Sequence, residues 1–303
     1  MDATSFDRIG LVVHPTRELG RAVATLREWA ERQDAALVQV PSPGQEQEVA
    51  PPGDADDCDL LVALGGDGTT LAALRAAAPA GRAVLGVACG SLGALTAVTA
   101  DKLDDALDRV ERGDWSERRL PGLIVERDGG TVTAINDLVL VRAGAGQIIV
   151  EVEVDGERFI RFGGDGLVAG TPLGSTAYTL AAGGPMLAPG ALGMVVTPLA
   201  PHGGVCPPLV TGPDSRLSIV MDPGHGGARL EVDGQVRAEL EPGEVARLAL
   251  RLEPAFATLV SLGEHEPLIA GLRRRRIVLD SPRILERDER EEASEHALPQ
   301  SRP

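Results

Sequence analysis

The chain has little lysine and little cysteine, and each shortage excludes a familiar kind of site. Its single lysine is Lys102, in "TADKLDD", so a Walker A loop, which ends in Gly-Lys-Ser/Thr, cannot be present. The three cysteines, Cys58, Cys89 and Cys206, are widely spaced and show neither CxxC nor Cys/His spacing. This pattern favours reduced thiols over a disulfide framework or a zinc site, and we therefore expect a cytoplasmic protein.

An excess of positive charge is also missing. The chain has 29 Lys and Arg against 45 Asp and Glu residues, a formal net charge of −16, and a pI near 4.8. No field of the whole protein would therefore attract nucleic acid or an anionic membrane, and we expect neither as a partner. A phosphate-bearing ligand must instead be held locally, by backbone amides, a few arginines or a bridging metal ion.

Membrane segments are not expected either. The start of the chain shows no basic region followed by an apolar one, so it predicts no signal peptide. Residues 83–100 and 166–213 contain no Asp, Glu, Lys or Arg, but Gly, Ser, Thr or Pro interrupts both. Such segments would leave unpaired backbone groups in lipid. We interpret them as buried or site-forming segments.

The first part of the chain alternates between strand and helix patterns. Strands are predicted over residues 8–13, 35–40, 59–64 and 83–88, and helices over about 69–78 and 101–111. A further helix is predicted from the helical spacing of Ala22, Val23, Leu26, Trp29 and Ala30. This alternation indicates a Rossmann-like α/β domain, with a parallel sheet and helices on both of its faces.

From about Pro121 the pattern changes to short strands separated by Gly and Pro. The pairs Asp155-Gly156 and Asp233-Gly234 are typical hairpin turns, so we predict an antiparallel β domain. A last helix over about 265–276 ends in four arginines, and the charged tail after Asp280 is predicted to be disordered. The expected domains are 1–120, to which a C-terminal helix at about 265–280 returns, then 121–264, followed by the tail 281–303.

The stretch "LLVALGGDGTTLAAL", residues 60–74, joins a strand to a helix through Gly-Gly-Asp-Gly. Backbone amides at a helix start hold phosphate oxygens, and glycine lets the ligand come close. An acid there would repel phosphate unless it binds a cation-bearing nucleotide or accepts a proton from a hydroxyl beside it. Because phosphoryl transfer needs the second arrangement, Asp67 is a candidate catalytic acid/base. The alternative is that Asp67 only caps its helix.

A second segment, residues 163–190, is rich in small residues and hydroxyls and has no charge after Asp165. Such a surface binds a sugar-and-base ligand through backbone groups and hydroxyls. Tyr178, the only tyrosine of the chain, lies within it. The alternative is a buried glycine-rich crossover in which Tyr178 fills the core.

Together, "GGDGTTL" (65–71) and "GDGLVAGTPLGSTAYTLAAGGP" (164–185) resemble the NAD kinase family along nearly the whole chain. Additional matches are "VVHPTRE" (12–18), "GSLGAL" (90–95), "INDLVLVR" (135–142), "TPLAPH" (197–202), "VDGQ" (232–235) and "LRRRR" (272–276). The first motif is shared with diacylglycerol and sphingosine kinases and with phosphofructokinases. The second is much more specific.

The resemblance implies a kinase that transfers a phosphoryl group from ATP or polyphosphate to the adenosine ribose 2′-hydroxyl of NAD, giving NADP. It implies a divalent metal, which we expect to be Mg²⁺. It also implies a homodimer or homotetramer in which a neighbouring subunit completes the site.

The resemblance also implies roles for individual residues. Asp67 would be the catalytic carboxylate, Asn136 and Asp137 would contact a ribose of NAD, and Asp165 would bond the adenine side. His202 matches the family's Pro-His, a possible further site residue. The other expected nucleotide contacts are Gly65, Gly66, Gly68, Thr69, Thr176, Ala177, Tyr178, Ala181 and Gln235.

Four positions depart from the family pattern. Ala94 stands where an aromatic is usual, Asp137 replaces Glu, Leu173 replaces a frequent Thr, and Ala181 replaces Ser. These changes motivate one alternative, a related kinase that acts on another nucleotide or nucleoside hydroxyl. A second alternative is a non-catalytic nucleotide-binding regulator with the same scaffold. The intact Asp67 argues against the regulator.

Overall fold

The computed structural model describes residues 6–188, 190–263, 268–287 and 290. The chain divides into two units, Met1–Gly263 and Glu264–Pro303. The second unit contains α5 (Leu268–Arg274), where a C-terminal helix is predicted, and Arg273 pairs there with Asp280. The return of this helix to the first domain stays a prediction. Of the tail expected to be disordered, residues 282–287 are helical, and residues 288–289 and 291–303 lie outside the described part.

The first unit begins with a parallel sheet in the strand order β4-β3-β1-β2. The elements of this part are β1 (Arg8–Val13), α1 (Gly20–Arg32), β2 (Ala36–Gln39), η1 (Ala55–Asp57), β3 (Leu60–Gly65), α2 (Asp67–Ala77), β4 (Ala83–Ala88), β5 (Val98–Thr99), η2 (Ala100–Lys102) and α3 (Leu103–Glu111). One core lies between the sheet and the pair α1 and α3, and a second lies against α2. Helices therefore cover both faces of the sheet, as predicted.

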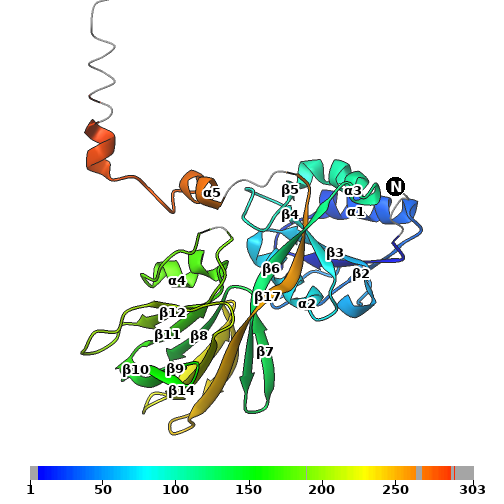
Figure 1. Ribbon diagram of the computed structural model, residues 1–303. Coiled ribbons are helices and arrows are strands. Elements are labelled where there is room, and N and C mark those ends of the chain that lie inside the picture. Colours follow the sequence, from blue (N-terminus) through cyan, green and yellow to red (C-terminus); the bar gives the residue numbers. More distant parts are fainter. Residues whose placement is uncertain (1–5, 189, 264–267, 288–289, 291–303) are drawn as a thin grey trace, which may run out of the picture. The chain divides into compact units, whose positions relative to one another are not determined.

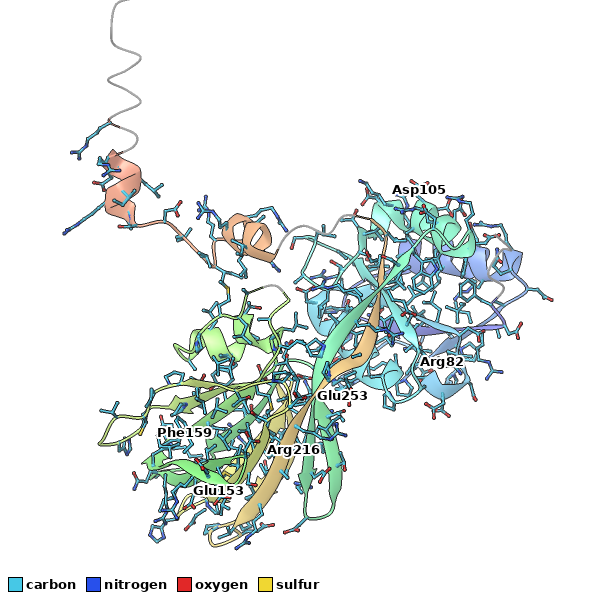
Figure 2. The ribbon with its side chains drawn as sticks, viewed as in Figure 1. Arg82, Asp105, Glu153, Phe159, Arg216 and Glu253 are labelled. Atoms are coloured by element: carbon cyan, nitrogen blue, oxygen red, sulfur yellow. The ribbon has the colours of Figure 1, made fainter. Side chains whose placement is uncertain are left out.

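The helix α1 shows why the sequence pattern is informative. All five residues expected to face the core are buried, and Leu26 and Trp29 are completely inaccessible. Charged side chains occupy the other face, as they do on α3, where Asp105 is exposed (Figure 2). A hydrophobic stripe at helical spacing thus fixes both the type of element and its orientation.

Two long strands connect this α/β part to the β-rich part. β17 (Ala246–Ser261) is parallel to β4 near its end and antiparallel to β6 (Ser116–Arg127) along most of its length. Figure 1 shows β6 in green and β17 in orange running side by side. Since β17 has the parallel partner β4 and the antiparallel partners β6 and β14 (Arg216–Asp222), one sheet continues through both regions. The expected boundary at residues 120 and 121 falls inside β6.

The β-rich part is built from two antiparallel layers. The continuing sheet adds β7 (Gly130–Ala134), β9 (Ile148–Val154), β10 (Glu157–Gly164) and β14 (Arg216–Asp222). The second sheet has the order β13 (Leu209–Val210), β12 (Val195–Leu199), β11 (Gly166–Gly170), β8 (Asp137–Arg142), β15 (Ala228–Val232) and β16 (Gln235–Leu240). Buried residues of both sheets, such as Ile148 and Leu167, form one core. The α/β plus antiparallel β fold class is confirmed.

Both predicted hairpin turns are present. Asp155 and Gly156 join β9 to β10, and Asp233 and Gly234 join β15 to β16. Their φ angles are 52°, 86°, 47° and 74°, the left-handed values that two-residue type I′ turns require. Among the described helices, none combines the length and the hydropathy needed to cross a bilayer.

Candidate active site

The Gly-Gly-Asp-Gly turn lies where β3 ends and α2 begins. Gly65 is the last residue of β3, Gly66 is the extended N-cap, and Asp67 is the first helical residue. The Thr70 backbone N–H and hydroxyl both donate to the Gly66 carbonyl, at 3.0 Å each. The amides of the first turn of α2 therefore face the carboxyl edge of the parallel sheet, where α/β folds bind ligands.

The Asp67 carboxylate is held by a loop from outside its own helix. The backbone N–H of Ala94 donates to Oδ2 at 2.9 Å and that of Leu95 to Oδ1 at 2.8 Å. A Cβ at Gly93 would meet this carboxylate, so only glycine lets the 93–95 loop approach it so closely. The N-cap residue of α2 is Gly66, so Asp67 does not occupy the cap position that the alternative interpretation gave it. The loop fixes the direction of the acid, and a carboxylate can accept more than two hydrogen bonds.

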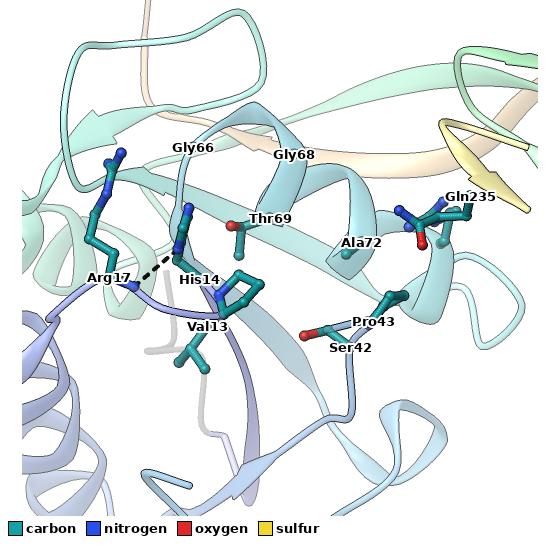
Figure 3. Close-up of a pocket in the computed structure, with 12 residues that line it drawn as sticks. Val13, His14, Arg17, Ser42, Pro43, Gly66, Gly68, Thr69, Ala72 and Gln235 are labelled. Atoms are coloured by element: carbon teal, nitrogen blue, oxygen red, sulfur yellow. Dashed lines mark hydrogen bonds between the residues drawn. The ribbon is translucent and has the colours of Figure 1, made fainter. Parts of the chain in front are cut away.

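A cavity of about 350 Å³ opens beside this turn (Figure 3). It is lined by Val13, His14, Pro15, Arg17, Ser42, Pro43, Gly66, Gly68, Thr69, Ala72, Arg75 and Gln235. In a chain with a net charge of −16, this lining includes two arginines and a histidine, and neither Asp nor Glu among the described residues. With helix-start amides beside them, these groups suit an anionic ligand.

His14 and Arg17 are held at the mouth of this cavity by local hydrogen bonds. The backbone N–H groups of Thr16 and Arg17 donate to His14 Nδ1 at 3.3 and 3.2 Å. The Arg17 guanidinium donates to the Cys89 carbonyl at 3.0 Å, which ties it to the end of β4. Figure 3 shows Arg17 and His14 next to Gly66.

Neither the packing nor the backbone conformation requires glycine at positions 66 and 68. A Cβ added at either position would find no heavy atom within 4 Å, and neither residue has a positive φ. Gly65 differs, because its Cβ would meet the side chain of Thr69. Gly66 and Gly68 therefore leave open space on the cavity wall, which allows a ligand to reach the backbone.

The segment 135–137 forms a second part of the site. The buried Asp233 carboxylate accepts hydrogen bonds from the backbone N–H groups of Ile135, Asn136 and Asp137, the shortest at 2.7 Å from Asn136. Thr171 bonds the same segment from the other side, with its N–H on the Asn136 carbonyl at 2.8 Å. These bonds connect the segment to Asp233 on one side and to Thr171 on the other.

Asp137 is a buried acid, with 4% of its surface exposed. Burial above all, and then the charge of Asp233, raises the pKa of Asp137 to about 7. A backbone hydrogen bond from Tyr178 opposes the rise, and the charge of Glu231 adds to it. Asp137 therefore changes charge near neutral pH. It does so next to the segment that contains Tyr178, whose backbone bonds to it.

The segment 176–181 lies beside Asp137 in η3 (Gly174–Thr176) and α4 (Tyr178–Ala181). Thr176 and Ala177 are half-buried, whereas Ala181 is exposed and Tyr178 is 41% exposed. The interpretation of Tyr178 as a core residue is therefore wrong. Its phenol ring is accessible to a ligand.

Asp165 and His202 lie at the other end of the second sheet. Asp165 precedes β11 and accepts from Arg142 Nε at 2.6 Å, while His202 Nδ1 and Gln147 Oε1 are 2.9 Å apart. Asp137 pairs with Gly170, the last residue of β11. With a rise of about 3.4 Å per residue, five residues place Asp165 about 17 Å from that end. Within one chain, Asp165 and His202 therefore lie far from Asp137 and the nucleotide contacts predicted beside it.

Four residues of the site were not expected from the sequence, namely His14, Arg17, Arg75 and Asp233. Arg75 carries a detectable signal: it follows Gly68 and Ala72 at positions i+7 and i+3 on one helix face, and it is the only cation of α2. Asp233 is recognisable from sequence only as a turn residue. Its buried contacts are about 97 residues away along the chain.

Replacing Gly68 by Ala tests whether the open space serves a ligand. We expect the free energy of unfolding to stay constant or rise by up to about 1 kcal/mol, because Ala favours helix. A Cβ in the ligand's path should weaken binding of inorganic tripolyphosphate about tenfold, or about 1.4 kcal/mol. Calorimetry measures both, and Gly20→Ala is the matched control, since Gly20 also starts a helix with no atom within 4 Å of a Cβ. Equal affinities in the two variants would contradict the assignment.

The raised pKa of Asp137 predicts a pH-dependent stability. A carboxyl whose folded pKa exceeds its unfolded value of 3.8 stabilises the fold below that value and loses this contribution as pH rises through about 7. The measured quantity is the difference in the free energy of unfolding between the wild type and Asp137→Asn. This difference should fall by a few kcal/mol between about pH 4 and 8, because each pH unit between the two pKa values removes about 1.4 kcal/mol. Urea unfolding across this range measures the difference, and a constant difference would refute the raised pKa.

Comparison with known proteins agrees with this arrangement. The sequence-family model of the ATP-NAD kinase N-terminal domain matches residues 9–115, and the family model of the ATP-NAD kinase C-terminal domain matches residues 135–250. NAD kinase 2 of Streptomyces coelicolor is 38% identical over 72% of this chain and 74% of its own length. NAD kinase 1 of the same organism is 32% identical over 92% of this chain and 88% of its own.

Two solved structures share the fold. Yeast NADH kinase complexed with NADH has a TM-score of 0.74 at 22% identity, covering 92% of this chain and 89% of the yeast chain. The Archaeoglobus fulgidus NAD kinase in complex with ATP has a TM-score of 0.67 at 22% identity, covering 88% and 98%. The family models, the sequence relatives and the fold agree, and the chain belongs to the ATP-NAD kinase family.

Proposed function

We propose that this chain transfers the terminal phosphoryl group of ATP to the adenosine ribose 2′-hydroxyl of NAD and so makes NADP. Its relatives in Streptomyces coelicolor are named NAD kinases, and a protein of the same fold is described with ATP. The observation that carries the proposal is the position of Asp67, an acid fixed by two backbone amides on the turn that walls a cationic cavity.

In the proposed reaction the cavity holds the donor. The amides of the first turn of α2, together with Arg17 and Arg75, bind the phosphate oxygens. A bond forms between the ribose 2′-oxygen and the terminal phosphorus, while the bond from that phosphorus to the bridging oxygen of ATP breaks. Asp67 accepts the hydroxyl proton, and ADP leaves with the bridging oxygen. Polyphosphate presents the same terminal group, so the cavity also suits that donor.

The acceptor is proposed to lie along the segments 135–137 and 176–181. Asn136 and Asp137 bind a ribose of NAD, while Thr176, Ala177, Tyr178 and Ala181 line the pocket. Gln235 lies in the donor cavity with Gly66, Gly68 and Thr69, which brings the β-rich part next to the phosphate-holding turn. Asp165 and His202 serve the same ligand from a neighbouring subunit of a homodimer or homotetramer, which is consistent with their distance from Asp137 within one chain.

A divalent ion, Mg²⁺ by preference, is part of this proposal. The described residues contain no group of three or more His, Cys, Asp and Glu side chains that could hold an ion by themselves. Mg²⁺ commonly binds through one or two carboxylates and substrate phosphates, and Asp67 is the one acid of the turn that could supply a carboxylate oxygen beside its bonds to Ala94 and Leu95. When bound, the ion would offset negative charge on the transferred phosphoryl group.

Replacing Asp67 by Asn tests the catalytic role. We expect kcat to fall at least about 10²-fold, because the amide cannot accept the hydroxyl proton. The free energy of unfolding should fall by about 1–3 kcal/mol, because an amide NH₂ cannot accept from a backbone N–H. NADP formation and urea unfolding are the two measurements.

Asp59→Asn is the control for loss of a carboxylate that binds backbone amides outside the cavity lining. The Asp59 Oδ2 atom accepts the backbone N–H groups of Asp7 and Arg8 at 2.8 and 2.9 Å, and the amide oxygen of Asn can still accept both. This variant should therefore lower stability less than Asp67→Asn does, and it should leave kcat unchanged. A variant Asp67→Asn with wild-type turnover would exclude Asp67 as the proton acceptor.

A further inference from the structure

Arg75 is a buried cation on the helix that starts at the phosphate-holding turn. Its side chain is 12% exposed, and it lines the donor cavity with Gly68 and Ala72 of the same helix face. Its Nη1 atom is buried and makes no hydrogen bond with the described residues. Buried donors are almost always bonded in folded proteins, so this nitrogen is placed to bind an acceptor.

The nearest anion to this nitrogen belongs to the acceptor side of the site. Arg75 Nη1 lies 3.8 Å from Asp233 Oδ2, and the Asp233 side chain is completely buried. Burial lowers the pKa of Arg75, whereas the charge of Asp233 raises it. The two groups therefore form an ion pair that is longer than a hydrogen bond.

Asp233 connects this pair to the segment proposed to bind ribose. Its carboxylate accepts the N–H groups of Ile135, Asn136 and Asp137, and its own N–H donates to the Asp137 carbonyl at 3.0 Å. The Asp233 carboxylate is therefore one of the groups, together with Thr171, that position the Asn136 and Asp137 backbone, and Arg75 pairs with this carboxylate.

We propose that Arg75 couples the two substrate sites, because one guanidinium both faces the donor cavity and pairs with the acid that positions the acceptor segment. This inference rests on the proposed function. A guanidinium has five N–H donors in a planar fork and can bind a phosphate oxygen and a carboxylate together. A donor phosphate that orders Arg75 also orders its contact with Asp233, so NAD then binds to a segment that is already held. Coupling of this kind is reciprocal.

The coupling is measured as the Kd of NAD with and without a saturating, non-hydrolysable ATP analogue. In the wild type the analogue should lower the Kd of NAD about fivefold or more, the usual lower range for coupled sites. In Arg75→Met this ratio should fall to about 1, since Met fills similar space without a charge. The matched control is Arg237→Met, which removes an exposed cation that lies near enough to lower the pKa of Arg75 but is not one of the residues lining the cavity. It should keep the wild-type ratio.

Arg75→Lys covers the case in which Arg75→Met leaves Asp233 unpaired and fails to fold. Lysine keeps the charge but lacks the planar fork, so the ratio should fall to half or less of the wild-type value. A wild-type ratio of 1, or an unchanged ratio in a folded Arg75 variant, overturns the inference while leaving the proposed function intact. A wild type that binds no NAD at all would instead refute the proposed acceptor, and with it this inference.

Discussion

The site depends on the two backbone hydrogen bonds from Ala94 and Leu95 that hold the Asp67 carboxylate. A carboxylate beside a phosphate site is ordinarily unfavourable, because the two anions repel each other. Here the amides offset part of its charge and direct it toward the 93–95 loop, while Arg17 and Arg75 supply positive charge to the cavity. An acid can therefore remain next to a donor phosphate and act on the hydroxyl that receives it.

The fold brings the two halves of this site together through a shared sheet. β17 pairs in parallel with β4 and antiparallel with β6 and β14, and the turn before α2 and the β15–β16 hairpin belong to the same compact unit. The Arg75–Asp233 pair crosses between these elements. Asp137, buried beside Asp233, changes charge near neutral pH, which makes the acceptor segment sensitive to its electrostatic surroundings.

Much of this could be predicted from the sequence, because local patterns determined it. The buried stripe of α1, the two Asp-Gly hairpins and the glycine turn at Asp67 all follow from short-range spacing. Contacts between distant residues left no local signal. Asp233 adopts the φ angle that its hairpin turn requires, and its carboxylate accepts a hydrogen bond from the Asn136 backbone. Only the turn could be predicted from the sequence. The same applies to Asp165, which pairs with Arg142, and to the strand β6, which continues past an expected domain boundary.

The most direct test is the fate of labelled phosphate. Wild-type protein is incubated with γ-³²P-labelled ATP, Mg²⁺ and, in parallel, NAD, NADH and a set of nucleosides, and the position of the label is determined by chromatography and NMR. We predict transfer to NAD, with the label in the 2′-phosphate of its adenosine ribose. No transfer to NAD, or a preference of about tenfold or more in kcat/KM for an acceptor other than NAD, corresponding to about 1.4 kcal/mol in the barrier, would contradict the proposed reaction.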